Sequence, residues 1–502
     1  MVYSFIIYTV SIVAIGYFFG RVKKTDSLSY FLGGRKMGPW VTALSAGASS
    51  ESAWVLMGLS GSAYLLGYQA FWLVPGCLLA YVFNFFILAP RLRHFSEQHN
   101  AVTVPDVLSI SFQNSKMIRT IASVIIFLTM TTYVVAQLTA SGKAFNAIFN
   151  LEYWQGVIIG ISIILLYTYT GGFKASSITD SIQASFMAIS MIGIPIYALI
   201  KIGGVRELHI SLSALDSKLT SFYSNEIGFN AFLIVIGWLS ISLAYPGLVH
   251  QLTRFMAIKD PKELKRAGII GSTWATIVFT GSIVFGLCAR LLISEVADTE
   301  QILPLFTSTN LTPILSGFVL AAIVSAIAST ADSQLVVATS ALSHDIFKKL
   351  LVEPWKETNS TSRPVYLTFA PIRAIIKWVY KNTANNEEVE EKINKLNKYI
   401  LLAIGIAATL FALSENRVIF HFVLYAWAGL GAAFGPPMIA LLFWKKVTRI
   451  GISSGMLAGF AMTIFWKEMG YGSSIIYEII PALIVSITLT FGIGLIEGRK
   501  DR

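Results

Sequence analysis

Charged side chains are scarce in this chain. Of its 502 residues, 13% are Asp, Glu, Lys or Arg, whereas 55% are hydrophobic. A soluble globular protein would carry about 25% charged residues. Apolar runs of roughly 20 residues, long enough to cross about 30 Å of hydrocarbon, recur along the whole sequence. The composition therefore predicts an all-α polytopic membrane protein with about 13 transmembrane helices.

Cysteine is nearly absent, and histidine shows no metal-binding pattern. Cys77 and Cys288 both lie in apolar segments, which favours packing roles over a disulfide or a metal pair. The six histidines are scattered without metal-ligand spacing. The sequence also lacks a phosphate loop, a nucleophile elbow and a nucleotide fingerprint, which argues against an ATP-driven pump. Because it lacks a pore-loop filter and a clustered acid–base set as well, we expect neither a channel nor an enzyme.

The excess of basic residues marks membrane topology. The formal net charge is +11, but Lys and Arg stand in short tethers between apolar segments, so we expect no nucleic-acid partner. These tethers lie at 21–24, 91–93, 254–266 and 445–449. Because cytoplasmic loops carry the excess of Lys and Arg, the N-terminus is predicted to lie outside and the C-terminus inside. No basic residue precedes the first apolar run, which predicts a first span rather than a cleaved signal peptide.

One polar stretch interrupts the second apolar segment. Ala43–Gly58 reads ALSAGASSESAWVLMG and holds Gly47, four serines and the carboxylate of Glu51. Lipid satisfies neither freed backbone groups nor an ionised side chain, so such features face a protein-lined cavity. We expect a broken helix here, unwound near Gly47. The break would free the carbonyls of Ala48 and Glu51, because their amide partners four residues later are lost.

A second polar run lies in the ninth apolar segment. Ser325–Gln334 reads SAIASTADSQ. Sodium takes about five or six hard oxygen ligands, and hydroxyls and carbonyls both qualify. Ser329 and Thr330 offer hydroxyls, and the Ala326 carbonyl lies one turn earlier. The alternative is that both hydroxyls only bond back to carbonyls of their own helix, as such residues often do in membranes.

The seventh apolar segment is interrupted like the second. Its small and polar residues are Ser240, Ser242, Tyr245, Pro246 and Gly247. Matching interruptions in two halves of a chain indicate an inverted-repeat transporter with its site between the halves. Coincidence is the alternative, since Gly, Ser and Pro are common in membrane helices. The predicted division is a first span and loop at 1–38, a first repeat of spans 2–6 at 39–205, a second repeat of spans 7–11 at 206–443 with a cytoplasmic insertion at 348–398, and two final spans with a tail at 444–502.

The insertion at 348–398 contains two helical patterns. Ile372, Ile375, Ile376 and Val379 oppose basic residues at helical spacing, which predicts a helix lying on the inner membrane surface. The glutamate cluster at 387–391 precedes two lysines and predicts a solvated helix. We favour an exposed linker as the role of this cluster, and a regulatory role is the alternative.

Four motifs occur in a fixed order along the chain: GASSESAWVLMG, TYTGGFKASSITDSIQ, GLVHQLTRFMAI and AIASTADSQL. Together they resemble the sodium/solute symporter family, and most of all its sodium/proline symporter branch, from Gly20 to about Trp444. The resemblance implies a LeuT-type fold with a five-plus-five inverted repeat, and one co-transported sodium ion between the second and ninth spans. The sodium ligands that it implies are the carbonyls of Ala48, Glu51 and Ala326 and the hydroxyls of Ser329 and Thr330. It also links Asp180 to cation coupling or a further sodium ion, for which an N-terminal cap on the sixth span is the alternative.

The resemblance implies a solute site as well. Its residues are Ser50, Ser52, Trp54, Tyr133, Ile241 and Tyr245. The branch carries an aspartate where this chain has Ser50, the acid here being Glu51. It carries Gly-Gln-Pro-His where Gly247–His250 reads GLVH, and Ile241 stands where it carries a tryptophan. These departures leave the identity of the solute open.

The side chain of Glu51 has two interpretations. If it faces the cavity, it would ligate a cation, pair with a substrate amine or exchange a proton. Otherwise only its carbonyl is used, and the carboxyl must find a polar partner elsewhere. We favour a functional side chain, with Asp332 as its expected partner in a polar layer.

The sequence thus predicts a sodium-coupled secondary active symporter of the cell membrane. It would import a small organic solute, most of all proline or a related amino acid, by alternating access. Its partners are the solute, sodium and the lipid bilayer, and its oligomeric state is not predicted. One alternative is a sodium symporter for another small carboxylate or a sugar acid. The other is a transporter-like sensor, which the end of the chain at Arg502 without a signalling domain disfavours.

Overall fold

The computed structural model describes residues 1–19, 27–293, 296–353, 375, 379, 386–414, 418–470 and 476–497. Within these residues the chain is helical between its turns, with one isolated bridge between Met37 and Ile258, so the all-α prediction is confirmed. Eleven helical segments of the described chain are long and apolar enough to cross a membrane, and the helix Tyr153–Tyr169 is apolar but shorter. One of the eleven, Trp54–Gln98, covers parts of two predicted spans, so helices underlie each predicted span.

The first half of the chain contains the helices up to the end of α9. They are α1 (Val2–Phe19), α2 (Ser27–Leu32), η1 (Gly33–Arg35), α3 (Pro39–Ser50), η2 (Trp54–Leu59), α4 (Ser60–Leu66), η3 (Gly67–Trp72), α5 (Leu73–Val82), η4 (Phe83–Leu88), α6 (Ala89–Gln98), α7 (Val104–Ile110), α8 (Lys116–Phe149) and α9 (Tyr153–Ile202).

The second half repeats this mixture of long and short helices. They are α10 (Val205–Leu215), η5 (Ser217–Thr220), α11 (Gly228–Ser240), η6 (Ile241–Gly247), α12 (Val249–Ala257), η7 (Pro261–Glu263), α13 (Leu264–Leu292), η8 (Thr299–Gln301), α14 (Ile302–Asn310), α15 (Pro313–Ser340), η9 (Ala341–Val352), α18 (Asn386–Ala412), α19 (Ile419–Phe443), α20 (Arg449–Glu468) and α21 (Ile479–Glu497).

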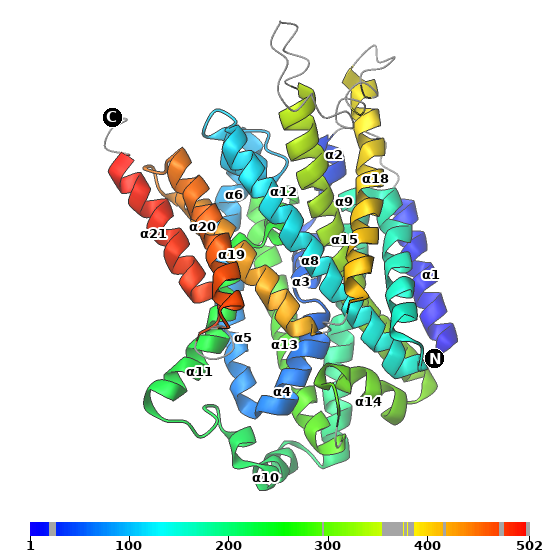
Figure 1. Cartoon of the computed structure of the whole chain (residues 1–502). Helices are drawn as coiled ribbons and strands as arrows, with labels where there is room; N and C mark the ends of the chain where they lie inside the picture. Colours follow the sequence, from blue (N-terminus) through cyan, green and yellow to red (C-terminus); the bar gives the residue numbers. More distant parts are fainter. Residues whose placement is uncertain are drawn as a thin grey trace, which may run out of the picture.

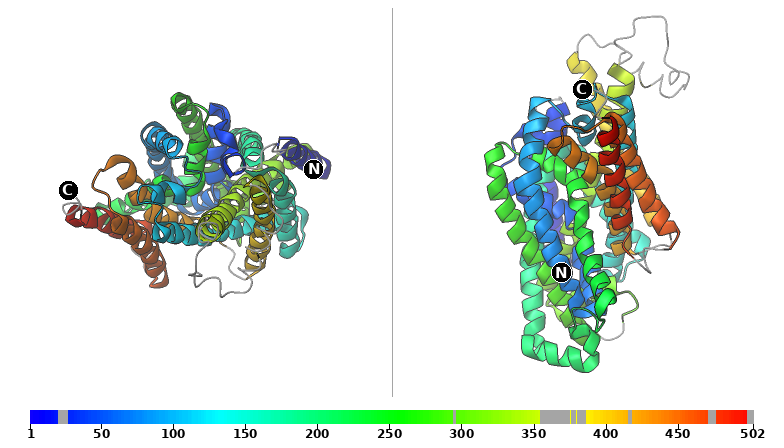
Figure 2. Two further views of the ribbon diagram at one scale, coloured as in Figure 1. Left: turned by 90° about the horizontal axis from the view of Figure 1, so that it is seen from above. Right: turned by 90° about the vertical axis from the view of Figure 1, so that its left-hand side faces the viewer.

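The long helices form one bundle, with short helices toward both of its ends (Figure 1). α10 and α14 lie at the end from which α1 starts, while α21 runs to the opposite end, where the C-terminus lies (Figure 1). α19, α20 and α21 gather on one side of the bundle, and α1, α9 and α18 lie on the other (Figure 2). The termini therefore lie toward opposite ends, as an odd number of spans requires.

α9 contains two predicted spans joined by a kink. At Gly172 the backbone has φ 53° and ψ −157°, a conformation that glycine adopts without the clash of a side chain. A Cβ at this position would also lie 3.2 Å from the carbonyl oxygen of Tyr30 in α2. The glycine therefore permits both the change of direction and the close approach of α2.

α3 breaks later than the sequence predicts. The helix continues through Gly47 and ends at Ser50, and the unwound residues are Glu51 and Ser52. Gly47 serves packing instead, because a Cβ there would lie 2.7 Å from ring atoms of Trp274 in α13. The predicted break near Gly47 is wrong by about one helical turn, since small residues in membrane helices also permit close helix contact.

Part of the insertion at 348–398 lies outside the described residues. The predicted surface helix falls there, apart from Ile375 and Val379. The glutamate cluster lies at the start of α18, in agreement with the predicted helix. Glu390 pairs with Lys348 of η9 and accepts a hydrogen bond from Ser27 at 3.2 Å. This helix therefore contacts the bundle, and the exposed-linker interpretation is wrong at Glu390.

Candidate sodium and solute site

The end of α3 presents a free carbonyl to α15. The amide of Ser52 bonds to the Ser50 carbonyl at 3.1 Å, so the Ala48 carbonyl loses its helical donor. That oxygen lies 3.0 Å from the hydroxyls of both Ser329 and Thr330. Ala48, Ser329 and Thr330 are all fully buried. The structure thus brings together three of the predicted sodium ligands, one from α3 and two from α15.

The two other predicted ligands flank this group. The amide of Val55 bonds to the Ser52 carbonyl at 3.0 Å, which leaves the Glu51 carbonyl without its helical donor. Ala326 is buried on α15, one helical turn before Thr330. The carbonyl end of a helix carries a partial negative charge, and carbonyls and hydroxyls are hard oxygen donors. This donor set fits a sodium ion.

The predicted solute residues form a connected cluster at the same break. The Tyr133 hydroxyl and the indole N–H of Trp54 each donate to the Ser50 carbonyl at 2.9 Å. The side-chain amide of Gln137 donates to the Ser52 hydroxyl at 3.1 Å. α8 thereby contributes two polar side chains to the unwound part of α3.

Aromatic rings enclose this cluster on the side of η6. Trp427 of α19 packs edge-on against Trp54 and Tyr245, with ring centroids 5.2 and 5.1 Å apart. Its indole N–H donates to the Tyr133 hydroxyl at 3.3 Å. Ile241 is 4% exposed and lies one turn before Tyr245 in η6. The surroundings combine apolar rings with a few fixed hydroxyls and amides.

Two tyrosines hold the Glu51 carboxyl. Its Oε1 accepts hydrogen bonds from Tyr245 at 2.6 Å and from Tyr81 of α5 at 3.0 Å. Its Oε2 has no hydrogen-bond partner among the described residues. The predicted pairing with Asp332 is wrong, because Glu51 faces α5 and η6 whereas Asp332 accepts a hydrogen bond from Ser333, toward α9.

Asp180 of α9 belongs to a separate buried polar layer. Its Oδ2 accepts a hydrogen bond from Ser45 at 2.7 Å and pairs with Nη2 of Arg254 at 3.2 Å. The Ser333 hydroxyl links Asp180, at 3.4 Å, to Asp332, at 3.0 Å. Arg254 thus pairs with Asp180 alone, while Asp332 joins the layer through Ser333, and the layer carries excess negative charge when both carboxyls are ionised.

The capping alternative for Asp180 is wrong. The helix of the sixth span begins at the Gly172 kink, and Asp180 lies about two turns inside it. The predicted start of the sixth span at Asp180 is therefore wrong as well. Asp180 bonds to side chains of α3, α12 and α15, and not to backbone amides in the first turn of its own helix.

Sequence reasoning missed several residues around the site. They are Tyr81, Gln137, Trp427 and Arg254. The sequence places Arg254 in a cytoplasmic tether, whereas its side chain is 2% exposed and paired with Asp180. A carboxylate inside an apolar span needs a partner, and that requirement could have identified the arginine. Tyr81, Gln137 and Trp427 stand outside the four motifs and give no comparable signal.

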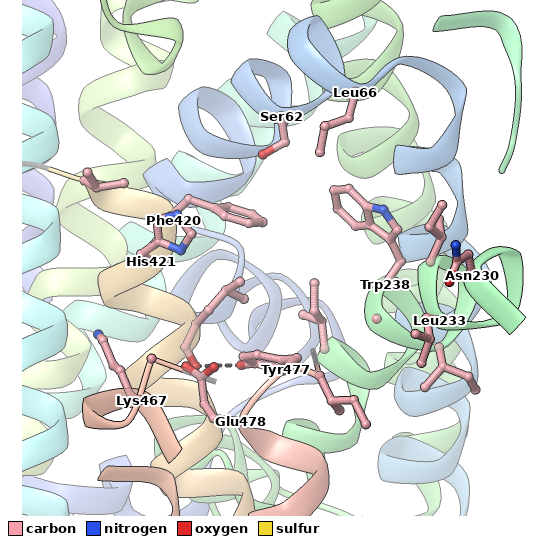
Figure 3. Close-up of a pocket in the computed structure, with 18 of the residues that line it drawn as sticks. Ser62, Leu66, Asn230, Leu233, Trp238, Phe420, His421, Lys467, Tyr477 and Glu478 are labelled. Carbon is pink, nitrogen blue, oxygen red and sulfur yellow. Dashed lines mark hydrogen bonds between the residues drawn. The ribbon is translucent and has the colours of Figure 1, made fainter. Parts of the chain in front are cut away.

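A cavity of about 980 Å³ lies next to the solute cluster (Figure 3). We call it the outer cavity; its lining includes Glu226, Trp238, His421, Lys467, Tyr477 and Glu478. Ile241 and Phe420 also line it, and the Phe420 ring lies 6.0 Å from the ring of Trp54. Because α21 runs from this cavity to the end where the C-terminus lies, the outer cavity is on the side predicted to be extracellular.

Buried charges join the helices on the opposite side. Arg119 of α8 pairs with Asp106 of α7 and with Asp345 of η9, the latter at 2.8 Å. His344 Nε2 lies 3.2 Å from Asp106 Oδ2, and the Thr103 hydroxyl donates to Asp345 at 2.8 Å. Burial alone would raise the pKa of the Asp106 carboxyl, but His344 and Arg119 hold that pKa well below its usual range. This inner network connects α7, α8 and η9 on the side predicted to be cytoplasmic.

Sequence comparisons match nearly the whole chain. The profile of the sodium:solute symporter family matches residues 30–372 and 368–459. The osmoregulated proline transporter OpuE of Bacillus subtilis is 32% identical over 503 residues, covering 99% of this chain and 94% of that protein. Sodium/proline symporters of Staphylococcus aureus strains are 33% identical over 498 residues, covering 97% of this chain and 90% of theirs.

A structural comparison shows the fold. A sodium-coupled sialic acid symporter, solved in a substrate-bound outward-open state, superposes with a TM-score of 0.75 at 17% sequence identity. The match covers 98% of this chain and 97% of that chain, which confirms the predicted LeuT-type fold. With its spanning helices, this is a multi-pass membrane transporter. The chain belongs to the sodium:solute symporter family.

Proposed function

We propose that this protein imports a small amino acid, proline or a close relative, together with sodium ions across the cell membrane. One observation carries the proposal: the Ala48 carbonyl meets the hydroxyls of Ser329 and Thr330 at 3.0 Å, at the break in α3. Relatives named as proline transporters, 32% and 33% identical over nearly the full chain, support the solute class.

Sodium would join α3 to α15. The ion would be coordinated by Ala48, Glu51, Ala326, Ser329 and Thr330. Its ion–dipole contacts would replace the weaker hydrogen bonds from hydroxyls to carbonyls. That contact favours the conformation in which the outer cavity is present and the inner network is closed. Each sodium ion that moves inward down 100 mV contributes about 2.3 kcal/mol before any concentration gradient. Release of the ion inward then loosens α15 and lets the inner side open.

The solute would bind at the unwound residues of α3. The rings of Trp54, Tyr133 and Trp427 suit the apolar part of an amino acid, and the positive end of the helix that begins at η2 suits its carboxylate. Glu51 supplies negative charge for its ammonium group through Oε2, which has no partner among the described residues. The proposed solute site also includes Ser50, Ser52, Ile241 and Tyr245.

A symporter for another small carboxylate or a sugar acid is the second candidate. It is favoured by the contact between Ser50 Oγ and His250 Nε2 at 3.2 Å, which places two neutral hydrogen-bonding groups at the break. Such a pair suits the hydroxyl groups of a sugar acid.

Asp180 and Asp332 would couple a cation to the movement of α9 against α15. The Ser333 hydroxyl links them and Arg254 pairs with Asp180 alone, so a cation entering this layer would neutralise the remaining negative charge. We also assign spans 2–6 (39–205) and spans 7–11 (206–443) to two inverted repeats. This assignment is supported by the interruptions of α3 after Ser50 and of α11 at η6, in corresponding spans.

A thermal-shift screen of the purified protein tests the function. It compares L-proline, other amino acids, small carboxylates and sugar acids, each in sodium chloride and in potassium chloride. We expect L-proline to raise the unfolding temperature only in sodium, because a bound ligand stabilises the form that it selects. Stabilisation by a sugar acid without any by L-proline would favour the second candidate. Equal stabilisation in potassium would contradict the coupling to sodium.

A further inference from the structure

The first helix of the chain, α1, packs closely against α9 and α15. It lies outside the two proposed repeats, yet small residues let it approach both helices. A Cβ at Gly317 of α15 would lie 2.7 Å from the Cβ of Ser4, and a Cβ at Gly16 would lie 2.9 Å from the Cβ of Tyr167 in α9. The position of α1 therefore bears directly on the helix that carries the proposed sodium ligands.

Tyr8 makes a polar contact between α1 and α15. Its side chain is 6% exposed, and its Oη lies 2.6 Å from Oγ of the fully buried Ser325. The side-chain amide of Gln183 in α9 donates to the same hydroxyl at 3.5 Å. The Tyr8 ring packs edge-on against Phe186, with ring centroids 5.2 Å apart. Both the ring and the hydroxyl of Tyr8 are thus held in place, and the hydroxyl is held against α15.

Ser325 begins the turn of α15 that ends at Ser329. The Ser329 hydroxyl lies 2.8 Å from the Ser325 carbonyl and 3.0 Å from the Ala48 carbonyl. A hydroxyl has one hydrogen to donate, and its lone pairs remain for an ion. A sodium ion would take lone pairs from both Ser329 and Ala48, so the hydrogen of Ser329 would then go to the Ser325 carbonyl. The next residue, Ala326, offers its own carbonyl as a proposed ligand.

We propose that Tyr8 is a positioning residue for sodium, which acts on the ion site through Ser325. Its hydrogen bond fixes the turn of α15 that carries the Ala326 carbonyl and the Ser329 hydroxyl. Without this bond, the Ser325 hydroxyl turns to a carbonyl of its own helix, and such back-bonding bends membrane helices. A bend at this turn moves both ligands relative to α3. The inference rests on the proposed function, because sodium must bind between α3 and α15.

Thermal unfolding of the purified full chain over a series of sodium concentrations tests this role. Choline chloride keeps the ionic strength constant, and no solute is added. Stabilisation by a bound ion depends on the ratio of its concentration to its Kd, so a weaker site shifts the whole curve to higher sodium. Tyr8→Phe removes the hydroxyl and keeps the ring. We expect a shift of about threefold, within the roughly twofold to tenfold range of one hydrogen bond. A purely structural role would lower every unfolding temperature without this shift.

Three further variants show whether Tyr8 acts through Ser325. Ser325→Ala breaks the same hydrogen bond from its other side and should give the same shift. The double variant Tyr8→Phe with Ser325→Ala should shift no further, because the two changes remove one bond. Tyr3→Phe is the matched control, since Tyr3 lies on the same helix and is 83% exposed. Its curve should be that of the parent protein.

The outcomes separate this role from the proposed function. A parental curve in Tyr8→Phe or in Ser325→Ala, or two shifts that add in the double variant, overturns the role of Tyr8 and leaves the sodium site standing. If Tyr8→Phe does not fold, the curve of Ser325→Ala decides alone. A parent protein that sodium does not stabilise contradicts the proposed coupling, and the role of Tyr8 falls with it. Stabilisation by sodium without any effect of L-proline contradicts the solute assignment alone.

Discussion

Thr330 donates its hydroxyl to the Ala48 carbonyl at 3.0 Å, and this contact gives the proposed sodium site its sharpest test at the scale of one residue. Thr330→Ala removes the oxygen, whereas Thr330→Ser keeps it. Loss of one such ligand costs about 1–3 kcal/mol, or roughly fivefold to 150-fold in affinity. We expect the sodium concentration for half-maximal solute uptake to rise by that factor in Thr330→Ala and to change little in Thr330→Ser.

Initial uptake rates over a series of sodium concentrations measure this effect. The three proteins should reach similar rates at saturating sodium if only the ion site is altered. Identical sodium dependence in all three would mean that the hydroxyl serves only the packing of α3 against α15.

Glu51 offers a backbone carbonyl to sodium and a carboxylate to the solute, and a single substitution separates these roles. Glu51→Gln keeps the carbonyl and removes the charge that Tyr81 and Tyr245 hold. Because loss of a charged hydrogen bond costs about 1.5–3 kcal/mol, we expect the solute KM to rise about tenfold or more. The sodium dependence should stay that of the parent protein.

Tyr81→Phe is the control for this substitution, because it removes one hydrogen bond to Glu51 and keeps the carboxylate. Its solute KM should rise less than that of Glu51→Gln. An unchanged KM in Glu51→Gln would show that the carboxylate does not bind the solute. Only the backbone carbonyl of Glu51 would then be functional.

Individual residues differed in how well the sequence predicted them. Ala48, Ser329 and Thr330 are in contact in the structure. Polar groups in membrane spans are unstable when they face lipid, so the two polar runs pack against each other. Ser329 also lies 2.8 Å from the Ser325 carbonyl, so bonding within its own helix and contact with α3 coexist. Trp427 could not be predicted, since a tryptophan in a membrane helix faces lipid or protein with equal ease.

At the scale of elements, the packing of α3 on α13 depends on Gly47. A methyl group there would lie 2.7 Å from ring atoms of Trp274, whose indole N–H is tied to the Ala184 carbonyl at 2.8 Å. Overpacking of this kind costs about 1–3 kcal/mol. We expect Gly47→Ala to lower the unfolding temperature of the purified protein and to reduce uptake.

Gly38→Ala is the matched control, because no atom lies within 4 Å of a Cβ at Gly38, just before the same helix. Its unfolding temperature should match that of the parent. A Gly47→Ala protein with parental stability would show that Trp274 moves aside at little cost.

Boundaries of elements were harder to predict than their existence. The sequence pattern located a broken helix in the second span, but it placed the break at Gly47 instead of at Glu51 and Ser52. A glycine in a membrane helix has two uses, unwinding and close contact, and only the neighbouring Trp274 decides between them. Asp180 was misplaced for a similar reason, since the kink at Gly172 sets the start of its helix.

For the whole molecule, the inner network is the feature that holds one side closed. Arg119→Ala leaves Asp106 and Asp345 buried without their shared guanidinium, a loss that costs about 3–5 kcal/mol. We expect a larger fraction of molecules to open on the inner side. Ser340 lies beside Thr103 in a small gap near this network, so a cysteine at Ser340 should react faster with a reagent applied from the cytoplasm.

The native cysteines are buried, which keeps the background reaction low. The control combines Arg119→Ala with Asp106→Asn and Asp345→Asn, and it should return labelling toward the parental rate because neither buried carboxylate remains without its guanidinium. Equal labelling in Arg119→Ala and in the parent would mean that the network does not hold the inner side closed.

The overall architecture was largely accessible from the sequence. Long apolar runs and basic tethers define the spans, because few structures other than helices satisfy the backbone within lipid. Which side of the bundle is packed in this structure could not be predicted from the sequence. The packing of each side depends on contacts between elements that are distant in the sequence, such as Arg119 with Asp345 and Phe420 with Trp54.

The coupling of solute movement to sodium is the central claim, and uptake by the purified protein in proteoliposomes measures it most directly. Radiolabelled L-proline is offered outside, with an inward sodium gradient or with equimolar potassium, and with and without a negative potential inside. We predict accumulation above the outside concentration only with the sodium gradient, faster with the potential because each ion carries charge inward. Equal uptake of L-proline in sodium and in potassium would contradict the account.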